Sequence, residues 1–346
     1  MRFLKFNQNY ETLQLKNTLK IKSGKDQKQV EVENGIYNIY GTGGIIGHTN
    51  TFLYDKESVG IGRKGTIDKP VYFDQPFWTV DTLFYSEIYE GFIPKYIFYL
   101  FQTINWKKYN TSTGVPSLTS SSIENIEKSF PCYDEQLKVA NFLTMIDMRI
   151  ETQIKIIDTL SSQKKQIRNL IFKDIHKNVN CCIQDYVVYE QPQKYIVHST
   201  DYLSYGKDYI PVLTANQSFI LGYTLEKDGI YEKGDCIIFD DFTNENKYVD
   251  FPFKVKSSAL KILQTKEGLM LKFFYEYLQF LKFESTDHKR HYLSEVAVTD
   301  INVPNLKEQT FVCKVFNSFD SKLKNEEALL EKYRLQKQFL LNNLFI

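Results

Sequence analysis

Two long stretches of the chain carry apolar residues at alternating steps of three and four, a spacing typical of helices that pack side by side. The first stretch covers residues 135–172 and contains no glycine or proline; the second lies 173 residues later. Each predicts one long amphipathic helix. The apolar positions are Leu143, Ile146, Ile150, Ile157, Leu160, Ile167 and Ile171 in the first helix, and Phe316, Phe319, Leu323, Leu330, Tyr333, Leu340 and Leu344 in the second.

The two stretches match position by position at this offset of 173, which indicates an internal duplication. Asp147, for example, returns as Asp320. A helix of about 38 residues is roughly 57 Å long and outruns a domain of ordinary size. We therefore expect the two helices to form an antiparallel coiled coil; the alternative is that each packs on its own domain. The polar residues that interrupt the apolar pattern also coincide, and they are Gln153 with Glu326 and Lys164 with Lys337.

The rest of the chain consists of two segments with short β-type runs and one short helical stretch each, at residues 94–102 and 269–281. We predict an α+β fold in which two pseudo-repeated α/β domains are separated by the long helices. The predicted boundaries are 1–133 for the first domain, 134–175 for the first long helix, 176–303 for the second domain and 304–346 for the second long helix. Their order of elements agrees while their side chains differ, as two different binding specificities would require.

Composition and charge exclude several classes of protein. The chain of 346 residues is 42% hydrophobic and 15% aromatic, with a net charge of +1, so overall charge does not announce a nucleic-acid partner. The five cysteines form no CxxC motif and no cluster with histidine, which favours a reducing, cytoplasmic compartment. No run of about 18 apolar residues occurs, so a membrane-spanning segment is not expected.

Motifs of catalysis are missing. The sequence has no Walker A motif and no nucleophile elbow, and its five histidines are scattered. The glycine-rich stretch 41–47 follows a predicted strand but precedes no helix, so we interpret it as a flexible loop beside a polar ligand or as a tight turn, and not as a cofactor site. We therefore expect no independent enzyme activity, no bound cofactor and no metal site in this chain.

Candidate DNA contacts come from basic, polar and aromatic residues in predicted loops. Arg63 and Lys64 lie between glycines in a turn, where side chains can reach phosphates. Two mixed basic and aromatic clusters, 106–110 and 287–292, recur at matching places in the two domains, although any one such cluster is more often a solvated surface. The candidate DNA-binding residues are Arg63, Lys64, Lys69, Lys107, Lys108, Ser117, Thr119, Lys207, Asn216, Gln217, Lys289 and Arg290.

Several motifs, in order along nearly the whole chain, resemble the specificity subunits of bacterial type I restriction-modification systems. The second domain departs from the resemblance, because residues 214–217 replace the glycine-rich turn and residues 240–242 replace Arg63-Lys64-Gly65. The matching stretches are Arg2-Phe3, Leu15, Lys22-Ser23-Gly24-Lys25, residues 37–47, Ile61-Gly62-Arg63-Lys64-Gly65, residues 114–119, Pro131 with Glu135-Gln136, and Ile146-Asp147.

The resemblance implies a DNA sequence-recognition subunit without catalytic activity. Each domain would be a target-recognition domain that reads one half of a bipartite, asymmetric site in double-stranded DNA, and the helices would set the gap. The partners would be two methyltransferase subunits, which bind S-adenosylmethionine and methylate adenine, and restriction subunits that use ATP and Mg²⁺. The alternatives are a coiled-coil adaptor between proteins and a stand-alone DNA-modifying enzyme.

Overall fold

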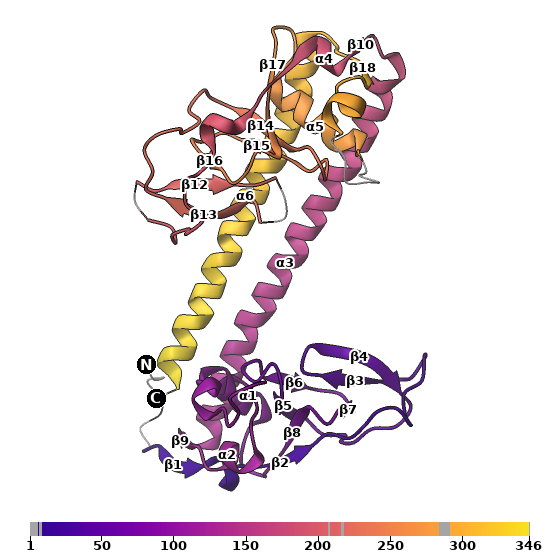
Figure 1. Cartoon of the computed structure of the whole chain (residues 1–346). Helices are drawn as coiled ribbons and strands as arrows, with labels where there is room; N and C mark the ends of the chain where they lie inside the picture. Colours follow the sequence, from indigo (N-terminus) through magenta and orange to yellow (C-terminus); the bar gives the residue numbers. More distant parts are fainter. Residues whose placement is uncertain (1–5, 7–8, 207, 216–217, 284–290, 346) are drawn as a thin grey trace. The chain divides into compact units, whose positions relative to one another are not determined.

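The computed structural model describes residues 6, 9–206, 208–215, 218–283 and 291–345 (Figure 1). The chain divides into two compact units: unit 1 holds residues 1–155 and 328–346, and unit 2 holds residues 156–327. Two long helices, α3 (Tyr133–Ile175) and α6 (Leu306–Leu344), contribute one part to each unit. Both long helices predicted from the heptad pattern are confirmed. The four-part division of the sequence stays a prediction.

Unit 1 contains three small sheets. Their strand orders are β2-β8-β5-β6, β4-β3-β7 and β1-β9. Strand β3 pairs antiparallel with β4 and parallel with β7. The strands are β1 (Glu11–Gln14), β2 (Leu19–Ser23), β3 (Tyr37–Gly41), β4 (Gly44–Thr49), β5 (Ser58–Gly62), β6 (Val71–Phe73), β7 (Phe77–Thr79), β8 (Leu83–Ile88) and β9 (Glu127–Phe130).

Unit 2 repeats this arrangement strand for strand. Its sheet orders are β11-β17-β14-β15, β13-β12-β16 and β10-β18, and β12 again pairs antiparallel on one side and parallel on the other. The predicted duplication therefore extends to the β-rich segments. The strands are β10 (Cys181–Cys182), β11 (Val187–Glu190), β12 (Ile210–Leu213), β13 (Ile220–Thr224), β14 (Cys236–Asp240), β15 (Asn246–Val249), β16 (Lys254–Val255), β17 (Leu260–Thr265) and β18 (Asp300–Ile301).

Short helices fill the connections between these strands. The two predicted helices are α1 (Pro94–Thr103) and α5 (Leu271–Leu281). A proline at the first helical position favours the start of α1, since its fixed φ suits that position. The others are η1 (Leu15–Asn17), η2 (Trp106–Tyr109), α2 (Ser120–Glu124), η3 (His176–Asn178), α4 (Ile183–Tyr186), η4 (Pro192–Tyr195) and the π-helical turn η5 (Tyr292–Val296).

The glycine-rich stretch 41–47 contains a tight hairpin turn at residues 42–43, as the sequence predicted. It connects β3 to β4, and Gly44 has a φ of 119°, a backbone conformation that side chains rarely adopt. No helix follows it, so it has none of the helix N-terminal geometry of a dinucleotide site.

The fourteen apolar positions predicted for the helix seam are all buried or half-buried. In unit 1, Leu143 and Ile146 of α3 join Leu340 and Leu344 of α6 in the core beneath α1. In unit 2, the ring of Phe172 stacks on those of Tyr277 and Phe316, with centroids 4.8 and 6.2 Å away. These contacts fuse each domain core with a helix pair, so helices and domains are stabilised together.

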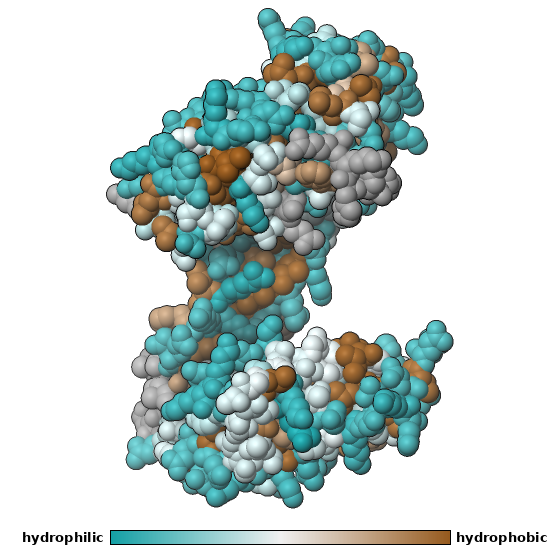
Figure 2. All heavy atoms as spheres, in the orientation of Figure 1, coloured by the Kyte–Doolittle hydropathy of each residue, from teal (hydrophilic) through white to brown (hydrophobic). Residues whose placement is uncertain are grey.

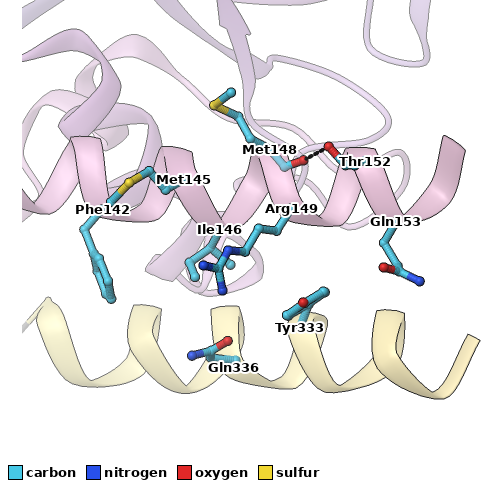
Figure 3. A pocket seen from close by; sticks show the side chains of 9 residues that line it. All are labelled: Phe142, Met145, Ile146, Met148, Arg149, Thr152, Gln153, Tyr333 and Gln336. Atoms are coloured by element: carbon cyan, nitrogen blue, oxygen red, sulfur yellow. Dashed lines mark hydrogen bonds between the residues drawn. The ribbon is translucent and has the colours of Figure 1, made fainter. Parts of the chain in front are cut away.

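The helix segments run antiparallel within each unit. In unit 2, Lys164 of α3 pairs with Asp320 of α6, while Phe172, further along α3, stacks on Phe316, which lies earlier in α6. In unit 1, Figure 3 shows residues of α3 following one another in the direction opposite to residues of α6. The ion pair there joins Lys337 Nζ to Asp147 Oδ1 at 2.7 Å. The two pairs are the same contact at an offset of 173, made once in each unit.

A repeated glutamine anchors each domain to its helix. Gln309 accepts a hydrogen bond from the Met270 N–H at 2.7 Å and donates to the carbonyls of Gly268 and Pro304 at 2.8 Å. Gln136 accepts from the Ile93 N–H at 3.2 Å and donates to the Pro131 carbonyl at 3.0 Å. Met270 and Ile93 are the N-cap residues of α5 and α1, so each glutamine satisfies a helix end.

Replacing Gln309 by alanine is expected to lower the free energy of unfolding by about 1–3 kcal/mol, because buried backbone groups lose their partners. Gln309 is fully buried. The matched control is Lys314→Ala on the exposed face of the same helix, which should change stability by less than about 0.5 kcal/mol. Urea unfolding of the two variants measures both values. Equal stabilities would contradict the anchoring role.

Candidate nucleic-acid interface

Two loops of unit 1 are joined where the sequence predicted DNA contacts. In the turn after β5, the Arg63 carbonyl accepts a hydrogen bond from the Leu118 N–H at 2.9 Å. The Gly65 N–H donates to the Pro116 carbonyl, also at 2.9 Å. Gly65 has a φ of 85°, which favours glycine at this position. Residues 63–65 and 116–118, far apart in the sequence, thereby form one rigid surface.

This surface borders a small cavity of about 290 Å³. The Arg63 guanidinium donates to the Asp81 carbonyl at 3.3 Å and lies 5.9 Å from the centre of the Phe84 ring, while Lys64 is exposed. Two cationic side chains with polar hydroxyls around them suit an anionic ligand such as a phosphate. The lining consists of Ser23, Arg63, Lys64, Phe84, Ser117, Leu118, Thr119 and Ser120.

Four of the candidate DNA-binding residues therefore come together, and others do not. Thr119 caps helix α2 by accepting the Ser122 N–H at 3.1 Å. Lys107 forms an exposed ion pair with Asp68 at 3.4 Å, and Lys69 and Lys108 are exposed outside the cavity lining. The remaining candidates lie outside the residues that the structure describes, and they are Lys207, Asn216, Gln217, Lys289 and Arg290.

The equivalent loop in unit 2 carries acidic instead of basic residues. Asp241 follows β14 as Arg63 follows β5: its N–H donates to the Ala259 carbonyl at 3.0 Å, while the Arg63 N–H donates to that of Thr82 at 2.7 Å. Asp241 Oδ2 lies 3.1 Å from Lys261 Nζ, and both side chains are buried. Unit 1 has Phe84 of β8 at the strand position of Lys261, so within the described residues only unit 2 has a buried ion pair here.

Unit 2 also contains a buried group of charges on its helix pair. Arg168 donates twice to Glu276 Oε2, at 2.9 and 2.7 Å, and Lys164 and Lys272 each lie 3.1 Å from Glu276 Oε1. Both lysines also pair with Asp320. Burial raises the pKa of Asp320, but the hydrogen bonds from the two lysines outweigh it and hold this pKa below its usual value. Three cations thus surround two carboxylates.

Unit 1 places a neutral side chain at the corresponding position. Tyr99 of α1 donates its hydroxyl to Asp147 Oδ2 at 2.7 Å, where α5 of unit 2 carries Glu276. Burial and this hydrogen bond raise the pKa of Tyr99. The sequence contained a signal for this network, since Asp147 and Lys164 both recur at the offset of 173, but their partners depend on the register between helices.

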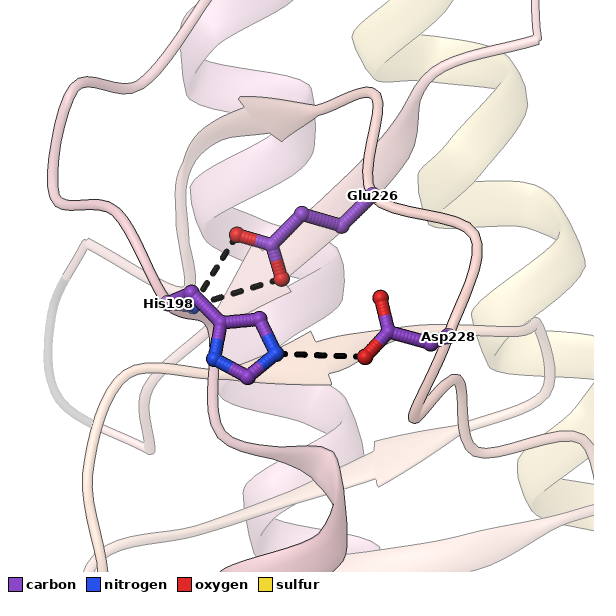
Figure 4. A group of neighbouring side chains, drawn as sticks. All are labelled: His198, Glu226 and Asp228. Carbon is purple, nitrogen blue, oxygen red and sulfur yellow. Dashed lines mark hydrogen bonds and ion pairs between the residues drawn. The ribbon is translucent and has the colours of Figure 1, made fainter.

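His198, Glu226 and Asp228 form a group whose ligand atoms could surround a metal ion (Figure 4). However, Glu226 already accepts a hydrogen bond from the backbone N–H of His198 at 2.9 Å. It also forms an ion pair with the buried ammonium of Lys254 at 2.7 Å. Lys254 also donates to the Asp228 carbonyl at 2.7 Å. The ammonium of Lys254 thus supplies the positive charge that a metal ion would provide. We interpret the group as a set of contacts that hold two loops together.

An apolar groove of about 490 Å³ lies on the helix pair of unit 1 (Figure 3). Met145 and Met148 beside it are 55% and 61% exposed, and at an offset of 173 they correspond to Ser318 and Ser321. In the view of Figure 2, hydrophilic residues cover most of the surface of each unit and apolar residues gather in patches. Exposed methionines of this kind are frequent on surfaces that contact other proteins.

The described residues include no helix that is both long and apolar enough to cross a membrane.

Comparison with known proteins gives consistent matches. The type I restriction modification DNA specificity domain matches residues 7–161. The specificity subunit of the type I restriction enzyme EcoR124I/EcoR124II of Escherichia coli is 48% identical over 122 residues, 34% of this chain and 30% of that protein. The MjaIX specificity subunit of Methanocaldococcus jannaschii is 25% identical over 235 residues, 65% of this chain. The matched region spans about half of this second relative, 52%.

Solved structures share the fold over the full length. The S subunit of a type I restriction-modification system from M. genitalium superposes with a TM-score of 0.68 at 17% identity, covering 100% of this chain and 99% of that one. A structure described as the basis of complex assembly and conformational transition of the type I restriction-modification system superposes with a TM-score of 0.55 at 9% identity, covering 98% of each chain. Residues 7–161 thus match a type I restriction modification DNA specificity domain, and the duplicated fold of the whole chain is that of the S subunit from M. genitalium.

Proposed function

We propose that this chain is the DNA sequence-recognition subunit of a type I restriction-modification complex. Each unit reads one half of a bipartite, asymmetric site in double-stranded DNA, and the paired helices set the number of unread base pairs between the halves. The chain carries no chemistry of its own; it positions DNA for catalytic partners.

The observation that carries this proposal is that the same arrangement of sheets and helix contacts occurs in both units. The sheets, the glutamine anchor and the aspartate–lysine pair recur in both units, while the charges on the loop after β5 and after β14 are reversed. A repeated scaffold with different surfaces is suited to reading two different DNA sequences at a fixed separation.

The proposed partners are two methyltransferase subunits and the restriction subunits. S-adenosylmethionine, ATP and Mg²⁺ belong to these partners, which methylate adenine and cleave DNA. The apolar groove with Met145 and Met148 supports a role of the helix pair in protein contacts. A methyltransferase that flips its target base explains why this chain needs only to grip and position the duplex.

Selection from a random duplex library tests the proposal. The full chain is mixed with the library, with and without a type I methyltransferase subunit, and bound duplexes are sequenced. We expect enrichment of two short defined sequences at a fixed spacing. If nothing is enriched in either mixture, the DNA-recognition proposal fails and the adaptor alternative is favoured; methylation or cleavage by the chain alone would favour an enzyme.

Removing the charges of Arg63 and Lys64 together is expected to weaken binding to all duplexes alike. Each phosphate contact contributes a slope of about −0.9 to the dependence of log affinity on log salt, so the slope should shrink by about 2. The control, Lys322→Ala with Lys324→Ala, removes the same charge from exposed positions on α6. Gel shifts at several salt concentrations give both slopes. A slope that matches the control would show that neither residue contacts a phosphate.

A further inference from the structure

A second polar cavity lies in unit 2, where the turn between β14 and β15 meets the end of α5. Its volume is about 370 Å³, and Thr243, Asn244, Lys247, Gln279, Lys282 and Phe283 are among its lining residues. None of the candidate residues taken from the sequence lines it. The cavity is thus a feature that only the packing of the turn on the helix creates.

Asn244 is the unusual residue of this cavity. Its side chain is 5% exposed, yet neither Oδ1 nor Nδ2 has a hydrogen-bond partner within the described part of the chain. Its φ of 60° explains why asparagine is tolerated in the turn, but glycine would serve that backbone equally well. Burying an unpaired carboxamide costs free energy, so a ligand that pairs with it is favoured.

Hydrogen bonds hold the backbone of Asn244 in place. The Asn244 N–H donates to the Asp240 carbonyl at 3.0 Å, and its own carbonyl accepts from Asn246 Nδ2 at 3.2 Å. Asn246 in turn accepts from Gln279 of α5 at 2.6 Å. The turn is thereby fixed to the helix, while the χ2 torsion of asparagine is broad enough for the carboxamide to rotate toward a ligand.

Charge and shape narrow the ligand to a nucleotide. Lys247 and Lys282 line the cavity, and within the described part of the chain neither forms an ion pair; two ammonium groups at one cavity suit a phosphate. Glu245, also in the lining, is exposed. Phe283 adds an apolar ring. A carboxamide offers one donor and one acceptor side by side, which is the complement of the N7 and N6 edge of adenine.

We propose that Asn244 reads an adenine in the half-site bound by unit 2, with Lys247 and Lys282 on the adjoining phosphates. This assignment rests on the proposed DNA-recognition function. The same adenine edge could belong to a free adenine nucleotide, and the experiment separates the two sources.

The experiment repeats the duplex selection with the full chain and its methyltransferase, using Asn244→Gly and Asn244→Asp. Glycine keeps the positive φ and removes the carboxamide; aspartate keeps the shape and loses the donor to N7. We expect both variants to lose adenine preference at one position of one half-site by roughly 5- to 150-fold. The other half-site is the internal control. Replacing that adenine by 7-deazaadenine should weaken wild-type binding by a similar factor and leave Asn244→Gly unaffected.

Failure of this inference is distinguishable from failure of the proposed function. If the wild type enriches no duplex, the DNA-recognition proposal itself is wrong. If the wild type enriches a bipartite site and both variants enrich the same site, Asn244 reads no base. Calorimetry with AMP tests the free nucleotide. If the wild type binds AMP, Asn244→Gly does not, and the duplex motif is unchanged, the ligand of Asn244 is a free nucleotide and not a DNA base. Equal circular dichroism spectra establish that the variants are folded.

Discussion

Replacing Glu276 by alanine is expected to destabilise unit 2 by about 3–5 kcal/mol, because it leaves buried cations without their counter-charge. Glu276 is fully buried and contacts Lys164, Arg168 and Lys272. Only Asp320, with a side chain 38% exposed, would remain to balance three cations. Glu276→Gln keeps the shape and removes only the charge, so it should show that loss of charge accounts for most of the effect.

The matched control for Glu276 is Tyr99 in unit 1. Tyr99→Phe removes one hydrogen bond to Asp147 and should cost about 1 kcal/mol. Urea unfolding gives the overall values, and hydrogen exchange of α5 locates the loss in unit 2. If Glu276→Ala were no more damaging than Tyr99→Phe, the buried charges would not determine how α5 is held on the helix pair.

Lengthening both helices by one heptad is expected to move the two half-sites apart. Seven residues add about 10 Å along a helix, which corresponds to about three base pairs at 3.4 Å each. Insertion after Lys155 in α3 and after Glu327 in α6, where the two units meet in sequence, preserves the apolar pattern. Each half-site should keep its sequence, because the reading surfaces lie outside the insertion.

Binding to the original site should fall on the order of 100-fold or more, since each lost base contact costs about 1–3 kcal/mol. The control is a heptad inserted in α3 alone, which breaks the antiparallel register and should abolish a defined spacing. Duplex selection measures the gap and both half-sites in one experiment. An unchanged gap in the doubly extended chain would show that the helices do not determine the spacing.

The sequence predicted the helices better than the surfaces. All fourteen positions taken from the heptad spacing are buried or half-buried, because burial in a helix pair repeats at a regular period; Phe172, which stacks on Phe316, was not among them. The heptad spacing did not identify the pairing of Asp147 with Lys337, although both residues recur at the offset of 173. That contact depends on how two helices are aligned, and no local pattern records the alignment.

The candidate contacts show a similar division. Arg63, Lys64, Ser117 and Thr119 come together because two loops share backbone hydrogen bonds, and the sequence did not predict that these loops meet. Asn244 has no such signal: it stands in an ordinary turn, and only burial without a partner distinguishes it. The sequence showed that residues 240–242 replace the Arg-Lys-Gly motif, but the ion pair between Asp241 and Lys261 required the structure.

The central claim is that this chain makes a methyltransferase read two separated sequences. The most direct measurement maps methylated adenines in a bacterial host that expresses the chain together with its methyltransferase, and in one that expresses the methyltransferase alone. The account predicts methylation only when the chain is present, in a motif of two short defined halves at one fixed gap. An uninterrupted motif, or the same motif without the chain, would contradict it.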